Sequence, residues 1–428
     1  MACSIGFAAC GHSVIGYDVI RERIRGLQRG QTPYNEDGLA AALTRQLRAG
    51  RLNFVEELAA AVGPSRFIVI TVGTPTTDSG EADLSFLKTA IESLAALDLR
   101  GKTIVLRSTV PPGTTDRIRN MLGDRVGLVY SPEFFREGSA VRDFMHPDRI
   151  VVGAYDQNVA QAYAAILESI DAPVYITSPR ESELVKNVSN GYLALKISFA
   201  NEIADMCDKL GADALKVLEA VGADRRIGGA SLAPGIGFGG PCFDKDLRSI
   251  VHTAVKVGAA RDLFESTLRV NWKQPRRVIA KLRNALGGSF AGAHIGVWGL
   301  TFKAGTDDVR HSLAISMVDA LLEEGASVRA FDPAVGSSHV LVRCELAASA
   351  LDVLDADALL VLTDWPEFKN VPAHAIAARL RKRIVVDGRN ALDGAALSAN
   401  GVDYYGVGRG LTTRRSTFTA DKDTEIAV

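Results

Sequence analysis

The sequence predicts an α/β protein with two Rossmann-like, doubly wound domains joined by a long central helix and a helical connector. Short apolar segments alternate with helical patterns before residue 180, and the alternation restarts after about residue 285. Between them the pattern indicates a long helix and a mainly helical middle region. Strands that alternate with helices are typical of parallel, doubly wound sheets. We therefore expect three parts, residues 1–180, 181–285 and 286–428.

The composition is that of an ordinary globular protein. The chain has 428 residues, too many for one typical domain, with 47% hydrophobic and 23% charged residues. A formal net charge of −1 without blocks of like charge argues against a nucleic-acid or membrane-surface partner. No apolar run approaches the ~18 residues of a membrane span. An anionic small substrate stays possible, because it needs only a local cluster of donors.

The cysteines indicate a reducing location. Residues 1–10 are apolar and small but have no basic residue before them, so they make a poor signal peptide. The spacing of the five cysteines fits neither a metal site nor a disulfide framework. We expect a cytoplasmic protein without a metal, in which one lone cysteine serves chemistry.

The expected elements of the first domain follow in order. Strands are predicted at 13–18, 68–72, 103–106, 126–130 and 150–153, and a helix at 84–97. Breakers such as Gly73-Thr74-Pro75 follow the strands.

The middle and the second domain are predicted in the same way. Apolar residues from Ser182 to about Leu210 suit one long helix, and helical pattern continues to roughly 285. The second domain has expected strands at 293–300, 327–332, 358–363 and 384–387 and a helix at 314–324. The polar residues 415–428 are expected to be loose.

The first residues read as part of a dinucleotide-binding unit. Asp18 ends a strand like the second strand of such a unit, whose acid binds ribose hydroxyls. Residues 3–10 resemble the end of the preceding helix, with Gly11 as its cap. Neither a first strand nor a G-x-G-x-x-G turn comes before them, so we expect two strands to lack a common neighbour. Our interpretation is a shortened version of a longer chain; the alternative is a protein that has lost cofactor binding.

The absence of the glycine turn is expected to lower the affinity for NAD. A glycine turn and the amino end of the following helix normally hold the dinucleotide diphosphate. With both absent, we expect weak NAD binding while a nucleotide-sugar site stays intact.

Residues 233–248, APGIGFGGPCFDKDLR, hold the strongest chemical signal. The glycines and prolines before Cys242 let backbone N–H groups approach a ligand closely. The cation of Lys245 is expected to favour the thiolate, which is the nucleophilic form. We expect Cys242 to be a nucleophile; the alternative is a free cysteine in a tight turn.

This segment resembles the nucleophile loop GFGGSCFPKD of the UDP-glucose/GDP-mannose dehydrogenase family, from which Pro241 and Asp244 depart. Neither departure replaces a catalytic group. Further segments resemble the family in the same order, over nearly the whole chain: GHSVIGYD at 11–18, TVGTP at 71–75, STVPPGT at 108–114, SPEFFREGSA at 131–140, ESELVKNVSN at 181–190, GLTFKAGTDDVRHS at 299–312 and VVDGRN at 385–390.

The resemblance implies an NAD-dependent oxidation of a nucleotide sugar through a thiohemiacetal and a thioester on the cysteine. RRIG at 225–228 and HPDRIVVG at 146–153 look most like the branch that turns UDP-glucose into UDP-glucuronate, a polysaccharide precursor. Two alternatives stay open: another nucleotide sugar, such as GDP-mannose or a UDP-N-acetylhexosamine, or a nucleotide-sugar-binding protein inactive through loss of the glycine turn. A homodimer or higher homo-oligomer is implied.

The resemblance also implies catalytic roles. Cys242 is the nucleophile, and Lys186 and Asn190, spaced i, i+4 on one helix face, stabilise an oxyanion. Asp246 holds the water that takes the alcohol proton, although a carboxylate there also suits a helix amino end. Glu133 assists thioester hydrolysis and Thr109 positions the attacking water.

Binding roles are implied for further residues, including Arg226, which reaches the sugar nucleotide of a neighbouring subunit. The implied domains are an NAD-binding domain (1–180), a connector and dimerisation region with the catalytic loop (181–285) and a UDP-sugar-binding domain (286–428). The implied NAD contacts are Asp18, Arg23, Thr74, Thr109, Glu137, Lys245 and Arg310. The implied substrate contacts are Glu133, Phe134, Phe135, Arg136, Glu137, Lys186, Asn190, Arg226, Phe238, Gly239 and Arg389.

Overall fold

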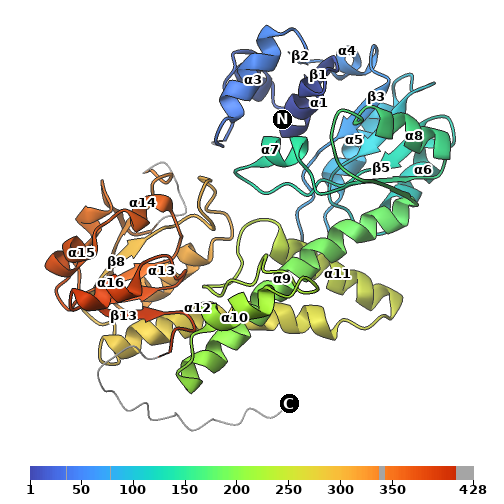
Figure 1. Cartoon of the computed structure of the whole chain (residues 1–428). Coiled ribbons are helices and arrows are strands. Elements are labelled where there is room, and N and C mark those ends of the chain that lie inside the picture. Colours follow the sequence, from blue (N-terminus) through green and yellow to red (C-terminus); the bar gives the residue numbers. More distant parts are fainter. Residues whose placement is uncertain (35, 78, 337–342, 411–428) are drawn as a thin grey trace. The chain divides into compact units, whose positions relative to one another are not determined.

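The computed structural model describes residues 1–34, 36–77, 79–336 and 343–410 (Figure 1). Contacts divide the chain into two compact units: unit 1 comprises residues 1–196, 238–269 and 301–312, and unit 2 comprises residues 197–237, 270–300 and 313–428. The three-part division expected from the sequence stays a prediction. The tail expected at 415–428 lies outside the described residues.

Unit 1 contains a five-stranded sheet of order β3-β4-β5-β6-β7. The bounds are β3 Phe67–Ile70, β4 Thr103–Leu106, β5 Gly127–Tyr130, β6 Ile150–Ala154 and β7 Val174–Thr177. All neighbouring strands are parallel except β5 and β6, which pair antiparallel. The sheet is therefore mostly, but not wholly, the parallel sheet that the sequence predicted.

Helices cover both faces of this sheet because side chains alternate along each strand. Ile104 and Leu106 of β4 pack in one apolar cluster with α5 (Ser85–Ala95) and α6 (Thr114–Leu122). Val105 packs in a second cluster with α1 (Ala2–Ala9) and α8 (Gln157–Ala165). Burial on both faces explains why β4 is apolar at nearly every position.

A separate two-stranded parallel sheet, β1 (Val14–Tyr17) with β2 (Leu52–Val55), lies near the start of unit 1. It packs with α1, α2 (Arg21–Gln28) and α3 (Leu39–Arg48), and α4 (Leu58–Val62) follows β2. Gly11 comes directly after the end of α1 with a positive φ of 95°, as expected for a helix cap. In the described chain β1 pairs only with β2 and β3 only with β4, so the expected absence of a common neighbour is observed.

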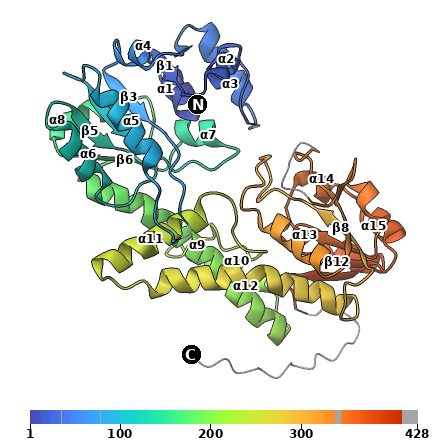
Figure 2. The same ribbon diagram turned by 180° about the vertical axis from the view of Figure 1, so that it is seen from behind.

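The central helix α9 spans Pro179–Leu210 and continues from unit 1 into unit 2. It begins before the expected Ser182, because proline is well suited to the first turn of a helix. The further helices are α7 (Ala140–Met145), α10 (Ala214–Gly222), α11 (Phe243–Val257) and α12 (Asp262–Ala285) (Figure 2). The sequence predicted a helical middle part with a loop rich in glycine and proline before Cys242, and residues 223–242 form turns and loop.

Unit 2 contains a six-stranded parallel sheet of order β10-β9-β8-β11-β12-β13. In chain order this is 3-2-1-4-5-6, the order of a Rossmann fold, which confirms the predicted second doubly wound domain. The elements are β8 His294–Trp298, α13 Leu313–Glu323, β9 Ser327–Phe331, β10 Glu345–Leu346, η1 Leu351–Val353, β11 Ala358–Val361, α14 Pro366–Lys369, α15 Ala373–Arg379, β12 Ile384–Asp387, α16 Gly394–Ala399 and β13 Asp403–Gly406.

No helix in the described ranges is both long enough and apolar enough to cross a membrane.

Candidate active site

A cavity of about 670 Å³ lies in unit 1 where strands β3, β4 and β5 end. Its walls include residues 71–76 after β3, residues 107–109 after β4 and Glu133 after β5. The carboxyl ends of parallel strands meet at one sheet edge, which is where α/β proteins gather ligand sites. Residues 1–3 and residues 240–242 and 244–246 of the cysteine loop also line it.

Cys242 is the residue before the first turn of α11, and its side chain is open to this cavity. Gly240, two residues earlier, has a φ of 81°, and a Cβ there would lie 2.7 Å from the ring of Phe302. On the other side of Cys242, the ring of Phe243 packs edge-on against Phe238 at 5.8 Å. The glycine is needed both for its backbone angle and for space, so the loop holds the cysteine in one place.

Three buried polar side chains lie together with Cys242. The Asn190 amide donates to Asp246 Oδ2 at 2.5 Å, and Lys245 Nζ donates to Asp246 Oδ1 at 2.5 Å. Lys186 Nζ donates to Glu133 Oε1 at 3.3 Å. Asp246 is only 1% exposed, and its charge is balanced by these donors. The structure thus brings together five of the six expected catalytic residues.

The pKa of the Cys242 thiol is raised, mainly by burial and then by the charge of Asp246. Lys186 and Lys245 act in the opposite direction but do not outweigh these effects. The expected direction of the effect of Lys245 is thus confirmed, although the pKa of the thiol as a whole is raised. Lys245 also forms an ion pair with Asp246.

Thr74 and Thr109, both in the cavity wall, are joined directly. Thr74 Oγ1 donates to the backbone carbonyl of Thr109 at 2.7 Å, which fixes the loops after β3 and β4 to each other. The Thr109 side chain, the sixth expected catalytic group, belongs to the same wall.

Only some of residues 133–137 line the cavity. Phe135 lines the cavity, whereas Phe134 lies beneath the cations of Arg149 and Lys186. Arg136 forms an ion pair with Asp143 at 2.6 Å and does not line the cavity.

Glu137 lies outside the lining as well. Its carboxylate accepts a hydrogen bond from Thr306 Oγ1 at 2.8 Å, and Lys303 Nζ donates to its backbone carbonyl. Burial raises the pKa of Glu137. The carboxylate thus fastens the segment 301–312 within unit 1.

Of the other expected NAD contacts, one lines the cavity and two do not. Asp18 and Arg23 form an ion pair with each other at 2.7 Å and do not line the cavity. Arg310 lines the cavity while paired with Asp308 at 2.6 Å.

Two expected substrate contacts belong to unit 2. Arg226 is exposed and pairs with Asp224 at 2.6 Å. Arg389 Nε donates to the carbonyl of Leu362 at 2.9 Å, and burial lowers the pKa of this arginine. Phe238, in unit 1, is buried and Gly239 is partly buried.

Tyr34 and Arg107 are among the residues of the cavity wall that the sequence reasoning missed. Arg107 follows the apolar strand Thr103–Leu106 directly. A charged residue at the carboxyl end of a buried strand was a signal that could have identified it.

The cavity fits the diphosphate of a dinucleotide in two respects. The amino end of α1 lines it, and the first turn of α1 has no acidic side chain. α1 spans Ala2–Ala9, and the expectation that the glycine turn and the start of this helix are absent stays a prediction. The buried guanidinium of Arg107 lies in the same wall.

Family models match the chain in three consecutive parts. Residues 1–171 match the NAD binding domain of the UDP-glucose/GDP-mannose dehydrogenase family, residues 180–273 its central domain and residues 296–394 its UDP binding domain.

Individual relatives are similar over nearly their whole length. The chain is 36% identical over 427 residues to UDP-glucose 6-dehydrogenase TuaD of Bacillus subtilis (97% of this chain, 92% of the relative). It is 37% identical over 425 residues to UDP-glucose 6-dehydrogenase of Rhizobium meliloti (96% and 97%).

Solved structures of nucleotide-sugar dehydrogenases are similar to the chain over nearly its whole length. A UDP-glucose dehydrogenase from Pyrobaculum islandicum has a TM-score of 0.85 at 37% identity, covering 95% of this chain and 94% of that one. A UDP-D-ManNAc dehydrogenase from Pyrococcus horikoshii also has a TM-score of 0.85, at 28% identity (95% and 96%). The chain belongs to the UDP-glucose/GDP-mannose dehydrogenase family and is an NAD-dependent oxidoreductase that acts on a nucleotide sugar.

Proposed function

We propose that this enzyme oxidises UDP-glucose to UDP-glucuronate, using two NAD and one water and releasing two NADH. The observation that carries the proposal is Cys242, open to a cavity beside the buried Lys186, Asn190 and Asp246. Relatives similar over nearly the whole chain are named UDP-glucose 6-dehydrogenase. A nucleophile beside buried cationic and amide donors suits a reaction with both an alkoxide and a covalent intermediate.

In the first oxidation the sugar alcohol loses its proton as its carbon loses a hydride. Bound NAD supplies the acceptor for the hydride in each of the two oxidations. Asp246 takes the alcohol proton through a water, and the Lys186 ammonium with the Asn190 amide stabilises the oxygen as negative charge develops. Burial of Lys186 and Asn190 strengthens these interactions because little water screens them.

In the second oxidation Cys242 is the nucleophile. Its sulfur forms a bond to the aldehyde carbon as the carbonyl π bond breaks, and the thiol proton passes to the former carbonyl oxygen. The resulting thiohemiacetal loses a hydride to the bound NAD and its hydroxyl proton to Asp246 through a water, and so becomes a thioester. Glu133 and Thr109 orient a water that attacks the thioester carbon, which breaks the carbon–sulfur bond and returns Cys242 as a thiol.

Replacement of Cys242 tests this proposal. Cys242→Ser is expected to yield no free UDP-glucuronate, because a serine hydroxyl is a far weaker nucleophile at neutral pH. Product is measured by chromatography and NADH by absorbance, with two NADH per sugar expected for the unmodified protein. Cys344→Ser, at a free cysteine of unit 2, is the matched control. Undiminished production of two NADH per sugar by Cys242→Ser would contradict the role of this cysteine.

The choice of sugar needs its own measurement. We expect kcat/KM to be highest for UDP-glucose among UDP-glucose, UDP-N-acetylmannosamine and GDP-mannose. A higher value for either of the others would keep the dehydrogenase chemistry and overturn the substrate. Binding of UDP-glucose without any NADH formation would favour the alternative of an inactive binding protein.

We also propose a cytoplasmic homodimer. All five cysteines are free thiols, as suits a reducing compartment. Part of α9 exposes a row of apolar side chains, Leu184, Val188 and Tyr192, which a second copy of the chain would cover.

A further inference from the structure

We propose that Glu183 is a positioning residue of the reaction, which holds the loop after β4 at one place on α9. That loop carries Thr109, and α9 carries Lys186 and Asn190. The contact therefore sets where the hydrolytic water lies relative to the oxyanion donors. This inference deepens the proposed function and rests on it, because thioester hydrolysis is the step in which Thr109 is given a part.

The first observation is that Glu183 is a fully buried carboxylate whose two oxygens both accept hydrogen bonds from the start of α6. Oε1 accepts from the backbone N–H of Thr115 at 2.7 Å and from its hydroxyl at 2.6 Å, and Oε2 accepts from the N–H of Gly113 at 2.5 Å. Gly113 is the cap residue of α6 and Thr115 lies in its first turn, where N–H groups lack partners within the helix. These hydrogen bonds are charge-assisted and agree with the helix dipole, so they hold the start of α6 firmly against α9.

The second observation is that the loop between Thr109 and Gly113 has little freedom to move by itself. The buried amide of Asn187 donates to the carbonyl of Val110 at 3.1 Å. On the other side, Thr74 Oγ1 donates to the carbonyl of Thr109 at 2.7 Å. The two residues before Gly113 are prolines, whose φ angles are fixed. A shift of the start of α6 is therefore passed on to Thr109 rather than absorbed between them.

The third observation is that the contacts to this loop and the proposed oxyanion donors share one face of α9. The face consists of four buried residues spaced i, i+3, i+4 and i+7, namely Glu183, Lys186, Asn187 and Asn190. Lys186 lines the cavity, and Asn190 donates to Asp246 in the cavity wall. One rigid helix thus joins the residues that hold the loop to those that serve the reaction, at a separation of about one helical turn.

A displaced Thr109 should affect one step of the proposed sequence more than the others. Both hydrides leave before water attacks the thioester, so the two oxidations need only the cysteine and the donors beside it. Thioester hydrolysis needs the water that Thr109 orients. A misplacement of about 1 Å can cost roughly a hundredfold in rate, and here that loss belongs to hydrolysis.

Glu183→Gln tests the inference. Glutamine keeps the shape and one acceptor, but its NH2 group then faces a donor at the start of α6. Stopped-flow absorbance follows NADH at saturating UDP-glucose and NAD, and mass spectrometry of the acid-quenched protein measures the UDP-sugar adduct on Cys242. Asp156→Asn is the matched control, because Asp156 caps α8 in the same unit by accepting from the N–H of Asn158 at 2.7 Å and does not line the cavity.

We expect Glu183→Gln to form NADH in a rapid burst of two per active site and then to turn over roughly tenfold to a hundredfold more slowly than the unmodified chain. The adduct on Cys242 should accumulate. Both kcat and KM for UDP-glucose should fall together, because kcat/KM reports only the steps up to the first irreversible one. A residue that matters only for stability would instead lower the burst and the steady rate by the same factor. Asp156→Asn should match the unmodified chain.

A double-mutant cycle shows whether Glu183 acts through Thr109. Thr109→Ala should show the same burst and slow turnover, and Thr109→Ala combined with Glu183→Gln should be no slower than Thr109→Ala alone. In the ligand-free chain, amide hydrogen exchange of residues 107–117 should be faster in Glu183→Gln and unchanged in Asp156→Asn. Multiplied effects in the double variant, or unchanged exchange in Glu183→Gln, would overturn the inference.

Two kinetic results would also overturn it, namely a steady rate of Glu183→Gln equal to that of the unmodified chain, or a slower rate without a burst. Should Glu183→Gln not fold, Glu183→Asp keeps the charge and shortens the side chain, and an unchanged rate in that variant would count against the inference. Normal turnover and exchange of Glu183→Gln in an active dehydrogenase would sink this inference alone. Faster exchange in Glu183→Gln, in a chain that oxidises no nucleotide sugar, would sink the proposed function alone.

Discussion

At the scale of single residues, Asp246 has two opposing effects on the site. Its carboxylate accepts hydrogen bonds from Asn190 and Lys245 at 2.5 Å, which orders Asn190, one of the two donors of the proposed oxyanion site. The same charge adds to burial in raising the pKa of the Cys242 thiol, which favours its protonated form. A protonated thiol is protected from oxidation and alkylation until substrate enters, because the thiolate is the reactive form.

The effect of Asp246 on the Cys242 pKa leads to a prediction for the ligand-free protein. Asp246→Asn removes an anion that raises the Cys242 pKa, so the thiolate fraction near neutral pH should increase several-fold, and about tenfold for each unit by which the pKa falls. Iodoacetamide should then label Cys242 faster, as measured by mass spectrometry of the labelled peptide.

Lys186→Met should act in the opposite direction, because this cation lowers the Cys242 pKa. In the unmodified chain the labelling rate should rise steadily as the pH is raised through neutrality, since the thiol pKa lies above its ordinary value. Slower labelling of Asp246→Asn at every pH would show that Asp246 acts on Cys242 through structure rather than charge. Cys242→Ser identifies the labelled site.

At the scale of elements, a close contact between β6 and the start of α9 positions two proposed catalytic groups. A Cβ on Gly153 would lie 2.6 Å from Ser182 Cβ and 2.8 Å from Pro179 Cα. Ser182 in turn donates to the carbonyl of Tyr130 at 3.1 Å. Since Lys186 and Asn190 follow one and two turns along α9, the glycine fixes their distance from the sheet.

Gly153→Ala is therefore expected to lower the free energy of unfolding by roughly 1–3 kcal/mol, the usual effect of overpacking. It should also reduce kcat, because α9 must shift to accommodate the methyl group. Gly229→Ala is the control for stability, since a Cβ there meets nothing within 4 Å and its φ is not positive. Thermal unfolding of both variants decides the matter, and equal midpoints would contradict the tight contact.

The elements also show what the sequence could predict. β4 and β12 have the predicted bounds, because continuous apolar β-branched runs bounded by breakers identify buried strands well. β2, β7 and β13 were not predicted, since these short strands contain polar residues or lie exposed, as β7 does over Val174–Ile176. The antiparallel pairing of β5 and β6 depends on chain path rather than residue pattern.

The candidate site was predictable to a similar degree. Lys186, Asn190 and Asp246 were expected through family resemblance, and helical spacing placed the first two on one face. The direction of the effect of Lys245 on the Cys242 pKa was predicted, but the larger opposing effects of burial and Asp246 were not, because they depend on packing in space. Arg107 was missed because its burial beside β4 is apparent only in the packed structure.

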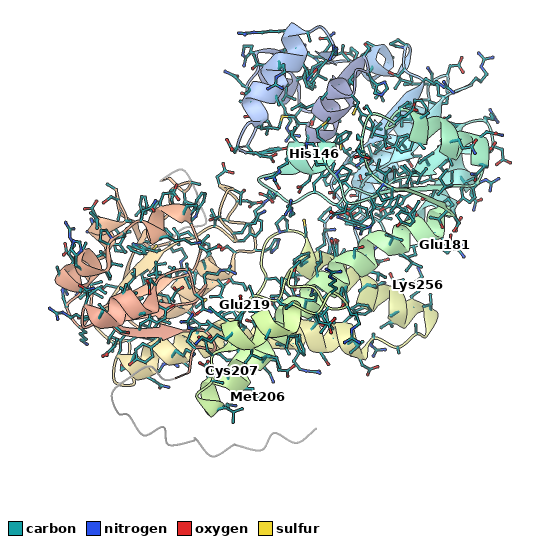
Figure 3. The ribbon with its side chains drawn as sticks, in the orientation of Figure 1. His146, Glu181, Met206, Cys207, Glu219 and Lys256 are labelled. Atoms are coloured by element: carbon teal, nitrogen blue, oxygen red, sulfur yellow. The ribbon has the colours of Figure 1, made fainter. Side chains whose placement is uncertain are left out.

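At the scale of the whole molecule, α9 presents an apolar face that the described chain leaves open. Leu184, Val188 and Tyr192 are 38%, 47% and 57% exposed, and their spacing of four residues puts them on one face of the helix. Further along the same helix Met206, labelled in Figure 3, is 53% exposed. Contiguous exposed apolar side chains on a rigid helix are typical of a protein–protein interface.

A second copy of the chain is the occupant that we propose for this face. A helix with a repeating apolar row can pack against its own copy about a two-fold axis, since an isologous contact uses the same face twice. Val188→Glu places a charge at the centre of the row, where burial in a dimer would leave it without a partner.

The measurement is light scattering after size-exclusion chromatography, at several protein concentrations. The unmodified chain is expected to have twice the mass of 45.6 kDa, and Val188→Glu the mass of one chain. Met121→Glu is the matched control, because Met121 on α6 is 51% exposed and does not belong to the α9 row. A dimer that survives Val188→Glu undiminished would move the interface away from this face, because a pair of buried, unpartnered carboxylates cannot be accommodated there without a large loss of affinity.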